Sequence, residues 1–205
     1  MVQGIFRILL LLLSCWLIGC GKANPKLPRL APEAKVLAFG DSLTYGTGAD
    51  AGTSYPAVLQ TLIRREVVNA GVPGEISAEG RERLPGLLDE LHPQLLLLCH
   101  GGNDILRKLP KDQTVDNLRQ MIKNARERNI PVVLIGVPEF AILSLKSAPY
   151  YQQLAQEFGI PIENEIISHL ERKLDMKSDQ IHFNQAGYRK LAEALQQLLS
   201  THGAL

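Results

Sequence analysis

The sequence of 205 residues places a serine, Ser42, in a Gly-Asp-Ser turn, and it places His182 three residues after Asp179. A serine hydroxyl is a weak nucleophile until a base within hydrogen-bond reach takes its proton, and a third group must orient that base. Histidine suits this task because its unperturbed pKa lies near neutrality. We therefore expect Asp179 to accept a hydrogen bond from one ring nitrogen of His182. The other ring nitrogen then stays available to Ser42, as acyl transfer requires.

Acyl transfer also needs hydrogen-bond donors for the oxyanion of the tetrahedral intermediate. Each such donor is worth about 2.7–4 kcal/mol of transition-state stabilisation. The candidates are the backbone N–H groups of Ser42 and Gly71 and the side-chain amide of Asn103. We expect Asp41 to shape the turn around Ser42, and Asp104 to hold the Asn103 loop in shape without reacting.

The elements that must bring these residues together alternate between strand and helix patterns. Continuous apolar runs predict strands, and apolar residues three and four positions apart predict helices. Strands that alternate with helices indicate a mostly parallel sheet covered on both faces. The expected fold class is α/β, a three-layer α/β/α sandwich with a five-stranded parallel sheet of flavodoxin-like order. The predicted strands are 36–40, 66–70, 94–99, 131–137 and 160–162, and the predicted helices are 55–65, 77–91, 115–128, 150–158 and 188–199.

The candidate residues follow these elements in a consistent way. Ser42 comes after the first predicted strand, Gly71 after the second and Asn103 after the third. Asp179 and His182 precede the last helix. In open α/β sheets, ligands bind outside the carboxyl ends of the strands, near the point where the strand order reverses. We therefore expect all five residues to converge on one edge of the sheet.

Four segments of the sequence resemble, in order, the motif blocks of the SGNH, or GDSL, hydrolases. They are residues 40–44 (Gly-Asp-Ser-Leu-Thr), 69–74 (Asn-Ala-Gly-Val-Pro-Gly), 101–104 (Gly-Gly-Asn-Asp) and 179–182 (Asp-Gln-Ile-His). The resemblance spans about residues 35–200 and looks closest to the bacterial thioesterase I, lysophospholipase and arylesterase branch. The second block matches loosely around its glycine.

The resemblance implies a role for each matched residue. Ser42 is the implied nucleophile, His182 the base and Asp179 its orienting partner, with Gly71 and Asn103 as oxyanion donors. One departure from the family pattern is His100, since relatives more often carry an aliphatic or other non-basic residue before the third block. We expect His100 to tune the pocket or the packing of the adjacent strand.

The expected reaction is hydrolysis of a carboxylic ester or thioester, such as an aryl ester, an acyl thioester or a lysophospholipid. It would proceed through an acyl-enzyme on Ser42, without a metal ion or organic cofactor. Apolar side chains after the third and fourth strands would line a groove for the acyl or aryl group, with local loop packing as the alternative interpretation. These side chains are Ile105, Leu106, Val137, Pro138, Phe140, Ile142 and Leu143.

Other interpretations stay open at this point. A metal-dependent hydrolase would use His100, Asp104, Asp179 and His182, but no His-Glu-x-x-His or Cys-x-x-Cys spacing occurs. A carbohydrate O-deacetylase of the same fold is a second alternative, which the lack of Trp after residue 16 disfavours. A third is a non-catalytic binding lipoprotein, against which the intact serine, aspartate and histidine argue. We expect the remaining histidines to be non-catalytic, namely His92, His169 and His202.

The first residues of the chain have the pattern of an export signal. Residues 8–18 are almost purely apolar, too short a run to span a bilayer but suited to a signal-peptide core. The run ends in Leu-Ile-Gly-Cys, which resembles a bacterial lipobox and implies that Cys20 is acylated. An ordinary cleaved signal or a membrane anchor is the alternative. Since Gly21 is not an aspartate, an outer membrane is the favoured destination in an envelope with two membranes, with the domain facing the periplasm.

The chain thus divides into a signal peptide (1–19), a lipidated cysteine with a flexible, proline-containing tether (20–34) and a hydrolase domain (35–205). Removing residues 1–19 takes away Arg7 and no acidic residue, which leaves 21 basic and 21 acidic residues. No polybasic run occurs, so nucleic-acid binding has little support. Cys99 is then the lone remaining thiol besides Cys20, and we expect it to be buried. The expected partners are an ester substrate and a membrane, and the expected oligomeric state is a monomer.

Overall fold

The computed structural model describes residues 25–141 and 144–205. The predicted signal peptide, Cys20, Ile142 and Leu143 lie outside the described residues. No helix within the described ranges is both long and apolar enough to cross a membrane.

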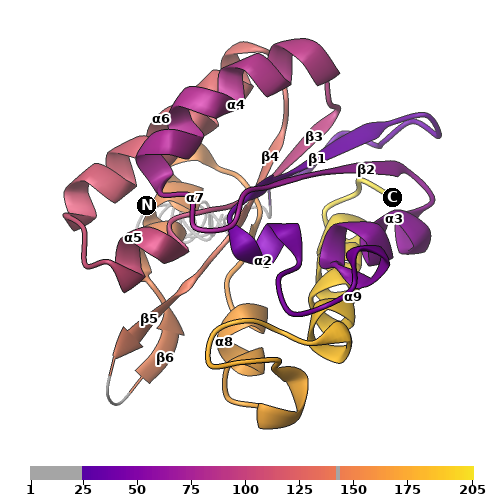
Figure 1. The fold of residues 1–205 in the computed structure, drawn as a ribbon. Helices are drawn as coiled ribbons and strands as arrows, with labels where there is room; N and C mark the ends of the chain where they lie inside the picture. The colour runs from indigo at the N-terminus through magenta and orange to yellow at the C-terminus, as the bar shows by residue number, and fades with distance from the viewer. Residues whose placement is uncertain (1–24, 142–143) are drawn as a thin grey trace, which may run out of the picture.

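A five-stranded parallel sheet forms the centre of the molecule (Figure 1), with the strand order β2-β1-β3-β4-β7. This is the predicted flavodoxin-like order, which reverses between β1 and β3. Gly40 pairs in register with Gly71 on one side and with Cys99 on the other, so three strands end at the same level. The strands are β1 (Lys35–Gly40), β2 (Glu66–Gly71), β3 (Leu95–Cys99), β4 (Val132–Ile135) and β7 (Ile162–Glu163).

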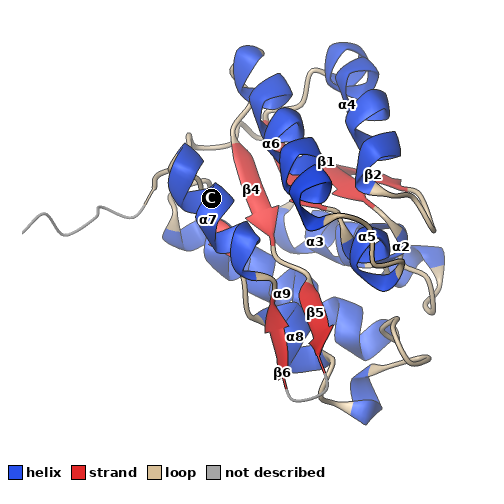
Figure 2. Ribbon diagram, turned by 90° about the vertical axis from the view of Figure 1, so that its left-hand side faces the viewer, coloured by secondary structure: helices blue, strands red, loops and turns tan. Residues whose placement is uncertain are grey.

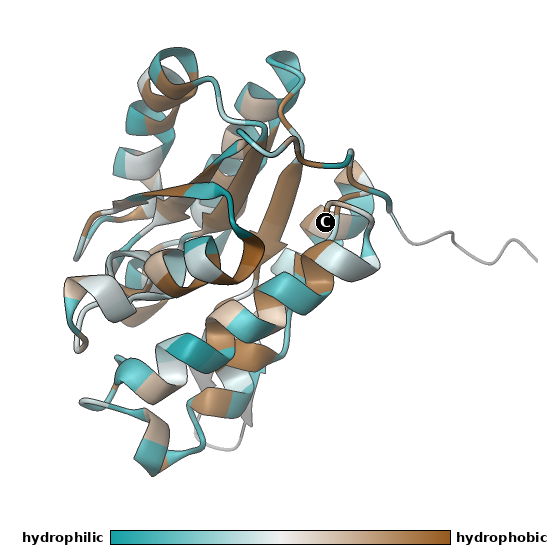
Figure 3. Ribbon diagram, turned by 90° about the vertical axis from the view of Figure 1, so that its right-hand side faces the viewer, coloured by the Kyte–Doolittle hydropathy of each residue, from teal (hydrophilic) through white to brown (hydrophobic). Residues whose placement is uncertain are grey.

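Helices cover both faces of this sheet, which confirms the predicted α/β/α sandwich (Figures 1 and 2). On one face α3 (Tyr55–Ile63) packs against α9 (Gln185–Thr201). On the other, α4 (Ser77–Leu91) packs against α6 (Lys111–Glu127), and α7 (Pro149–Phe158) lies beside α6. Figure 3 shows hydrophobic strands between helices that carry hydrophilic residues on their outer surfaces.

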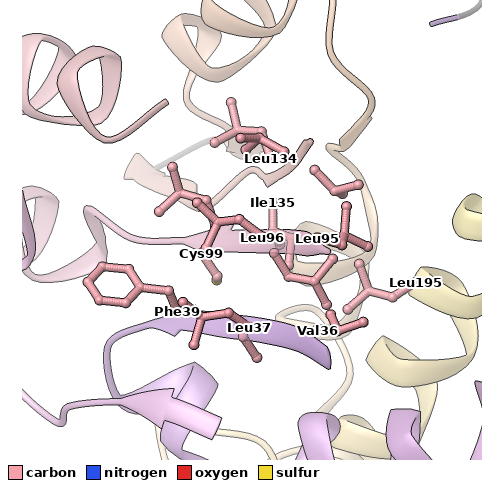
Figure 4. Packing of buried hydrophobic residues seen from close by; sticks show 14 of the residues in the cluster. Val36, Leu37, Phe39, Leu95, Leu96, Cys99, Leu134, Ile135 and Leu195 are labelled. Atoms are coloured by element: carbon pink, nitrogen blue, oxygen red, sulfur yellow. The ribbon is translucent and has the colours of Figure 1, made fainter. Parts of the chain in front are cut away.

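The core explains why β3 is a continuous apolar run. All five of its residues are buried, because helices cover both sides of a central parallel strand. Figure 4 shows side chains of β1, β3, β4 and α9 packed together, including Phe39, Leu96 and Leu195. Cys99 belongs to this core and is fully buried, as predicted, and burial raises the pKa of its thiol well above the usual value.

Several short elements were not predicted from the sequence. The fourth strand ends at Ile135, and the chain then forms an antiparallel pair, β5 (Pro138–Ala141) and β6 (Ser144–Ser147). Proline is tolerated at the start of β5 because it need not donate to a neighbouring strand there. The others are too short for a helical period to be visible in sequence: α2 (Ser42–Tyr45), α5 (Gly102–Leu106), α8 (Ile166–Leu170), and the 3₁₀ turns η2 (Ala51–Thr53) and η3 (Leu174–Met176).

The prediction of a flexible tether over residues 20–34 is wrong for residues 25–34. Leu27 and Leu30 are 8% and 4% exposed and belong to the hydrophobic core. Their N–H groups donate to the carbonyl oxygens of His202 and Ala204 at 2.8 and 2.9 Å. The segment therefore packs against the C-terminal end of α9, because its leucines bury apolar surface and its backbone pairs with the end of the chain.

Candidate active site

Ser42 begins α2 directly after the end of β1. The Asp41 carboxylate accepts a hydrogen bond from Leu43 N–H at 3.1 Å and caps this short helix. Gly40 must be a glycine, because a Cβ at this position would lie 2.0 Å from the carbonyl oxygen of Cys99. The Gly-Asp-Ser sequence thus turns the chain sharply out of the sheet and fixes where the hydroxyl of Ser42 stands.

His182 connects Ser42 with Asp179. Its Nε2 lies 2.9 Å from Ser42 Oγ, and its Nδ1 lies 2.7 Å from Asp179 Oδ2. The second carboxylate oxygen of Asp179 accepts from the N–H groups of Ile181 and His182, both at 2.7 Å. Although desolvation opposes ionisation, these hydrogen bonds lower the pKa of Asp179 to about 2. The carboxylate is therefore ionised at neutral pH and holds the imidazole toward the serine.

The turn that carries Asp179 and His182 is braced on both sides. Ser178 N–H donates to the carbonyl oxygen of His182 at 3.0 Å, and Lys177 pairs with Phe183 in an isolated β-bridge. The Lys177 ammonium also forms an ion pair with Glu171 of the segment that follows α8. Burial raises the pKa of Glu171, while Lys177 opposes that shift.

The side-chain amide of Asn103 has a hydrogen available for an oxyanion, whereas the backbone N–H of Gly71 does not. Asn103 Nδ2 donates to the backbone oxygen of Glu75 at 3.0 Å, which uses one of its two amide hydrogens. Gly71 N–H donates to Asn69 Oδ1 at 3.0 Å and is therefore occupied. A Cβ at Gly71 would lie 2.1 Å from Tyr45 N, so this glycine lets α2 approach the sheet. The structure gives Gly71 a packing role and does not support the predicted donor role.

Gly74, three residues later, has the features of a backbone donor that the sequence interpretation missed. Its φ of 81° is in the left-handed region that favours glycine. Among the described residues its N–H has no hydrogen-bond partner. The next residue, Glu75, contacts Asn103 directly. Both glycines follow β2 in the second motif block, so the sequence alone did not separate them.

The two acidic residues beside the site have structural contacts. Asp104 is 3% exposed and accepts from Ser77 N–H and Oγ–H at 2.8 and 2.5 Å and from Thr114 Oγ1 at 3.2 Å. It therefore ties the Asn103 loop to α4 and α6, as expected. Asp41 is 2% exposed, and burial raises the pKa of its carboxyl.

The wall of the groove beside Ser42 is mainly apolar and includes Leu106, Val137 and Pro138 from the predicted substrate-binding set. Ile105 packs against the core instead, and the side chain of Phe140 lies outside the described part of the structure. The enclosed part is small, about 20 Å³. The wall also includes three residues that the sequence interpretation missed: Ile167 of α8, Glu171 directly after it, and Ile181 between Asp179 and His182.

The histidines outside the Ser42 site have other partners. His100 is fully buried, with Nε2 at 3.0 Å from Glu75 and Nδ1 accepting from Gly101 N–H at 2.9 Å, so neither nitrogen is open to a metal ion. Within the described ranges, no group of three or more His, Cys, Asp or Glu side chains is arranged to hold a metal. His92 ends α4 and His202 ends α9, while His169 is exposed on α8.

The fold and this site together define a class, the hydrolases of α/β/α-sandwich fold with a serine, histidine and aspartate at the carboxyl edge of a parallel sheet. The chain belongs to the GDSL-like lipase/acylhydrolase family, whose pattern matches residues 38–190. It is therefore a GDSL-type hydrolase that acts on ester bonds.

Known proteins agree with this assignment. The chain is 32% identical over 164 residues to thioesterase 1/protease 1/lysophospholipase L1 of Escherichia coli (strain K12), covering 77% of this chain and 79% of the relative. It is 29% identical over 206 residues to an arylesterase of Vibrio mimicus, covering 96% and 98%. The crystal structure of TesA superimposes with a TM-score of 0.72 at 27% identity, over 82% of this chain and 99% of TesA.

Proposed function

We propose that Ser42 attacks the carbonyl carbon of a carboxylic ester or thioester while His182 takes its proton. The observation that carries this proposal is the continuous hydrogen-bond chain from Ser42 Oγ through His182 to Asp179, at 2.9 and 2.7 Å. His182 then donates the proton to the leaving alcohol or thiol, and an acyl-enzyme remains on Ser42. A water molecule that His182 activates releases the acid and restores the serine.

The oxyanion of each tetrahedral intermediate would be held by the backbone N–H of Ser42, the free amide hydrogen of Asn103 and the N–H of Gly74. Donors of this kind stabilise the transition state strongly because they are already oriented when the charge develops. The ionised Asp179 stabilises the imidazolium that forms at each step and does not take up its proton.

An amphiphilic or aryl ester fits the surroundings of Ser42 best. Leu106, in the wall of the groove, is 41% exposed, so apolar surface continues from the groove to solvent. Among the described residues, the exposed large apolar side chains belong to α2, α5 and η3 or to the loops after β2 and α5: Tyr45, Val72, Leu106, Leu109 and Leu174. The narrow enclosed space leaves a long acyl chain to lie along this open surface. The names of the relatives, thioesterase, lysophospholipase and arylesterase, support the same substrate range.

We also propose that the protein is exported as a monomer and held in the cell envelope by a lipid on Cys20, in an outer membrane where two membranes exist. The support is the order of a charged residue, an apolar core, a small residue and a cysteine in the first twenty positions. Radiolabelled palmitate incorporation into the wild type but not into Cys20→Ala tests this proposal.

A fluorophosphonate probe together with a substrate panel tests the reaction. We expect the probe to label the wild type and not Ser42→Ala, and we expect hydrolysis of p-nitrophenyl esters, acyl thioesters or lysophospholipids by the wild type alone. Ser200→Ala is a matched control, because it removes an exposed serine hydroxyl near the far end of α9 and leaves the nucleophile in place. Equal labelling of Ser42→Ala and the wild type would contradict the proposed nucleophile. Activity confined to acetylated sugars would favour the O-deacetylase. The absence of both labelling and hydrolysis would favour a non-catalytic binding protein.

A further inference from the structure

A polar cluster, formed by the Glu75–Arg83 ion pair and the buried His100, lies behind the segments that supply the proposed oxyanion donors. Arg83 Nε and Nη2 each lie 2.7 Å from a different oxygen of the Glu75 carboxylate, whose side chain is only 5% exposed. His100 Nε2 lies 3.0 Å from the same carboxylate. A carboxylate withdrawn from water is costly unless charges and hydrogen bonds compensate it, so these partners hold Glu75 firmly in one place.

The hydrogen bonds of His100 determine its protonation. Gly101 N–H donates to Nδ1 at 2.9 Å, so Nδ1 carries no proton, and Nε2 carries the proton that is donated to Glu75. The Tyr151 hydroxyl donates to the backbone oxygen of His100 at 2.7 Å. A neutral imidazole with one fixed tautomer therefore connects Glu75 to the start of the loop that carries Asn103.

Glu75 transmits this constraint to both sides of the proposed oxyanion hole. The backbone oxygen of Glu75 accepts the 3.0 Å hydrogen bond from Asn103 Nδ2. On its other side, Glu75 is joined by its peptide bond to Gly74. Arg83 Nη2 also donates to the carbonyl oxygen of Ala70 at 3.0 Å, at the other end of the same turn. The cluster thus fixes the turn from residue 70 to residue 75 at both ends, and it orients the Asn103 amide through the last residue of that turn.

The space around His100 is shaped for an imidazole ring. A Cβ at Gly80 of α4 would lie 2.4 Å from His100 Nε2, so the absence of a side chain there makes room for the ring. The ring also lies against Phe39, with 5.8 Å between ring centroids, and the Arg83 guanidinium lies 4.2 Å above the same phenyl ring. An aliphatic residue in place of His100 would fill this space without forming either hydrogen bond.

We propose that His100 is a positioning residue of the oxyanion hole, which acts through Glu75 and Gly101 to hold the Asn103 amide in the orientation that meets the oxyanion. This inference rests on the proposed donor role of Asn103. Since a donor that is oriented in advance acts on the transition state more than on the bound substrate, losing His100 should lower kcat and leave KM nearly unchanged.

A double-mutant cycle of His100→Leu and Asn103→Ala tests this inference, with kcat and KM for p-nitrophenyl butyrate and the Tm of each variant. We expect Asn103→Ala to lower kcat by about 10²–10³-fold. His100→Leu should lower kcat by about tenfold or more with KM within twofold, and it should have almost no further effect once Asn103 is absent. His100→Gln, whose amide can donate to Glu75 and accept from Gly101, should recover most of the lost kcat.

A control separates this role from general loss of stability. Tyr188→Phe removes a part-buried hydrogen bond to Thr47 O, 2.8 Å long, and should lower Tm while kcat stays within about twofold. Glu75→Gln replaces His100→Leu in the cycle if the leucine variant does not fold. The positioning role would be overturned if His100→Leu, or Glu75→Gln in its place, lowered kcat by the same factor with and without Asn103. A lower Tm with unchanged kcat would overturn it as well. An Asn103→Ala variant with full kcat would instead refute the proposed donor role of Asn103.

Discussion

Lys177 and Glu171 form an ion pair at the edge of the groove beside Ser42, with side chains only 10% and 3% exposed. The Lys177 ammonium also donates to the backbone oxygen of Gln180 at 2.5 Å, inside the turn between Asp179 and His182. The pair therefore joins the segment after α8, which lines the groove, to the turn that orients the imidazole. The ion pair thus connects the wall of the groove to the turn that carries Asp179 and His182.

Breaking this pair from one side should be worse than removing it altogether. Lys177→Met leaves the Glu171 carboxylate buried without its partner, and we expect a loss of about 3 kcal/mol in the free energy of unfolding. The double variant Glu171→Leu/Lys177→Met should recover most of that loss, because it leaves no unpaired charge. Urea denaturation of the two single variants and the double variant measures the coupling. Additive losses would show that the ion pair is not an energetic unit.

Replacing the orienting carboxylate should reduce turnover and leave the fold intact. We expect Asp179→Asn to lower kcat by about 10⁴-fold, the size of the effect known for the equivalent change in a serine protease, because an amide favours the wrong tautomer of the imidazole. Steady-state kinetics measure this loss. The matched control is Asp175→Asn, an exposed acid four residues earlier, which should retain activity within about twofold. A comparable loss of kcat in both variants would show that removing a negative charge near the site matters, and not the specific hydrogen bond to His182.

The stability of the fold should fall in acid in a defined pH window. Desolvation raises the pKa of Glu75, but the hydrogen bonds from Arg83 and His100 outweigh it and lower that pKa from 4.5 to about 2, and Asp179 also titrates at about 2. Because the unfolded chain binds these protons more readily, the stabilisation is fully present above about pH 5 and is lost as pH falls toward 2. Urea unfolding between pH 2 and pH 7 measures the slope. Glu75→Gln should flatten part of it, and an unchanged slope would contradict this contribution.

Three glycines should respond to alanine in different ways. Gly40→Ala places a Cβ 2.0 Å from a backbone oxygen of β3, so we expect severe destabilisation, of several kcal/mol. Gly86→Ala in α4 meets nothing within 4 Å and should stabilise the protein by about 0.5–1 kcal/mol through helix propensity. Gly52→Ala, with equally open surroundings, should be nearly neutral. Thermal unfolding ranks the three variants, and a tolerated Gly40→Ala would show that β1 and β3 can separate.

The strand order and the convergence of Ser42, Asn103 and His182 were predictable because Ser42 and Asn103 each follow a clear apolar strand run and His182 precedes the long, periodic last helix. The three residues occupy one edge since parallel strands end together, a rule of topology that needs no side-chain detail. By contrast, α8 and its neighbour Glu171 were missed, because a helix of five residues does not complete enough turns to show a period.

Which glycine after β2 offers a free N–H to the oxyanion depends on the three-dimensional structure. Gly71 and Gly74 stand in the same motif block, and they differ in properties that no sequence pattern reports, namely a positive φ at Gly74 and a hydrogen bond from Gly71 to Asn69. The segment before β1 was misjudged for a related reason. Its prolines predict an extended chain, but whether Leu27 and Leu30 find apolar partners depends on where α9 ends.

With the proposed lipid on Cys20, the docking of residues 25–34 at the end of α9 would determine which way the protein faces relative to the membrane. The catalytic turn immediately precedes the first residue of α9, and Pro25 O contacts His202 at the other end of a helix about 25 Å long. Four residues separate a lipid-bearing Cys20 from Pro25, so the two Cα atoms would lie at most about 18 Å apart. On so short a connection, a molecule with α9 upright would turn its active site away from the membrane. Its substrates would then arrive from the aqueous compartment and not from the lipid leaflet beneath it.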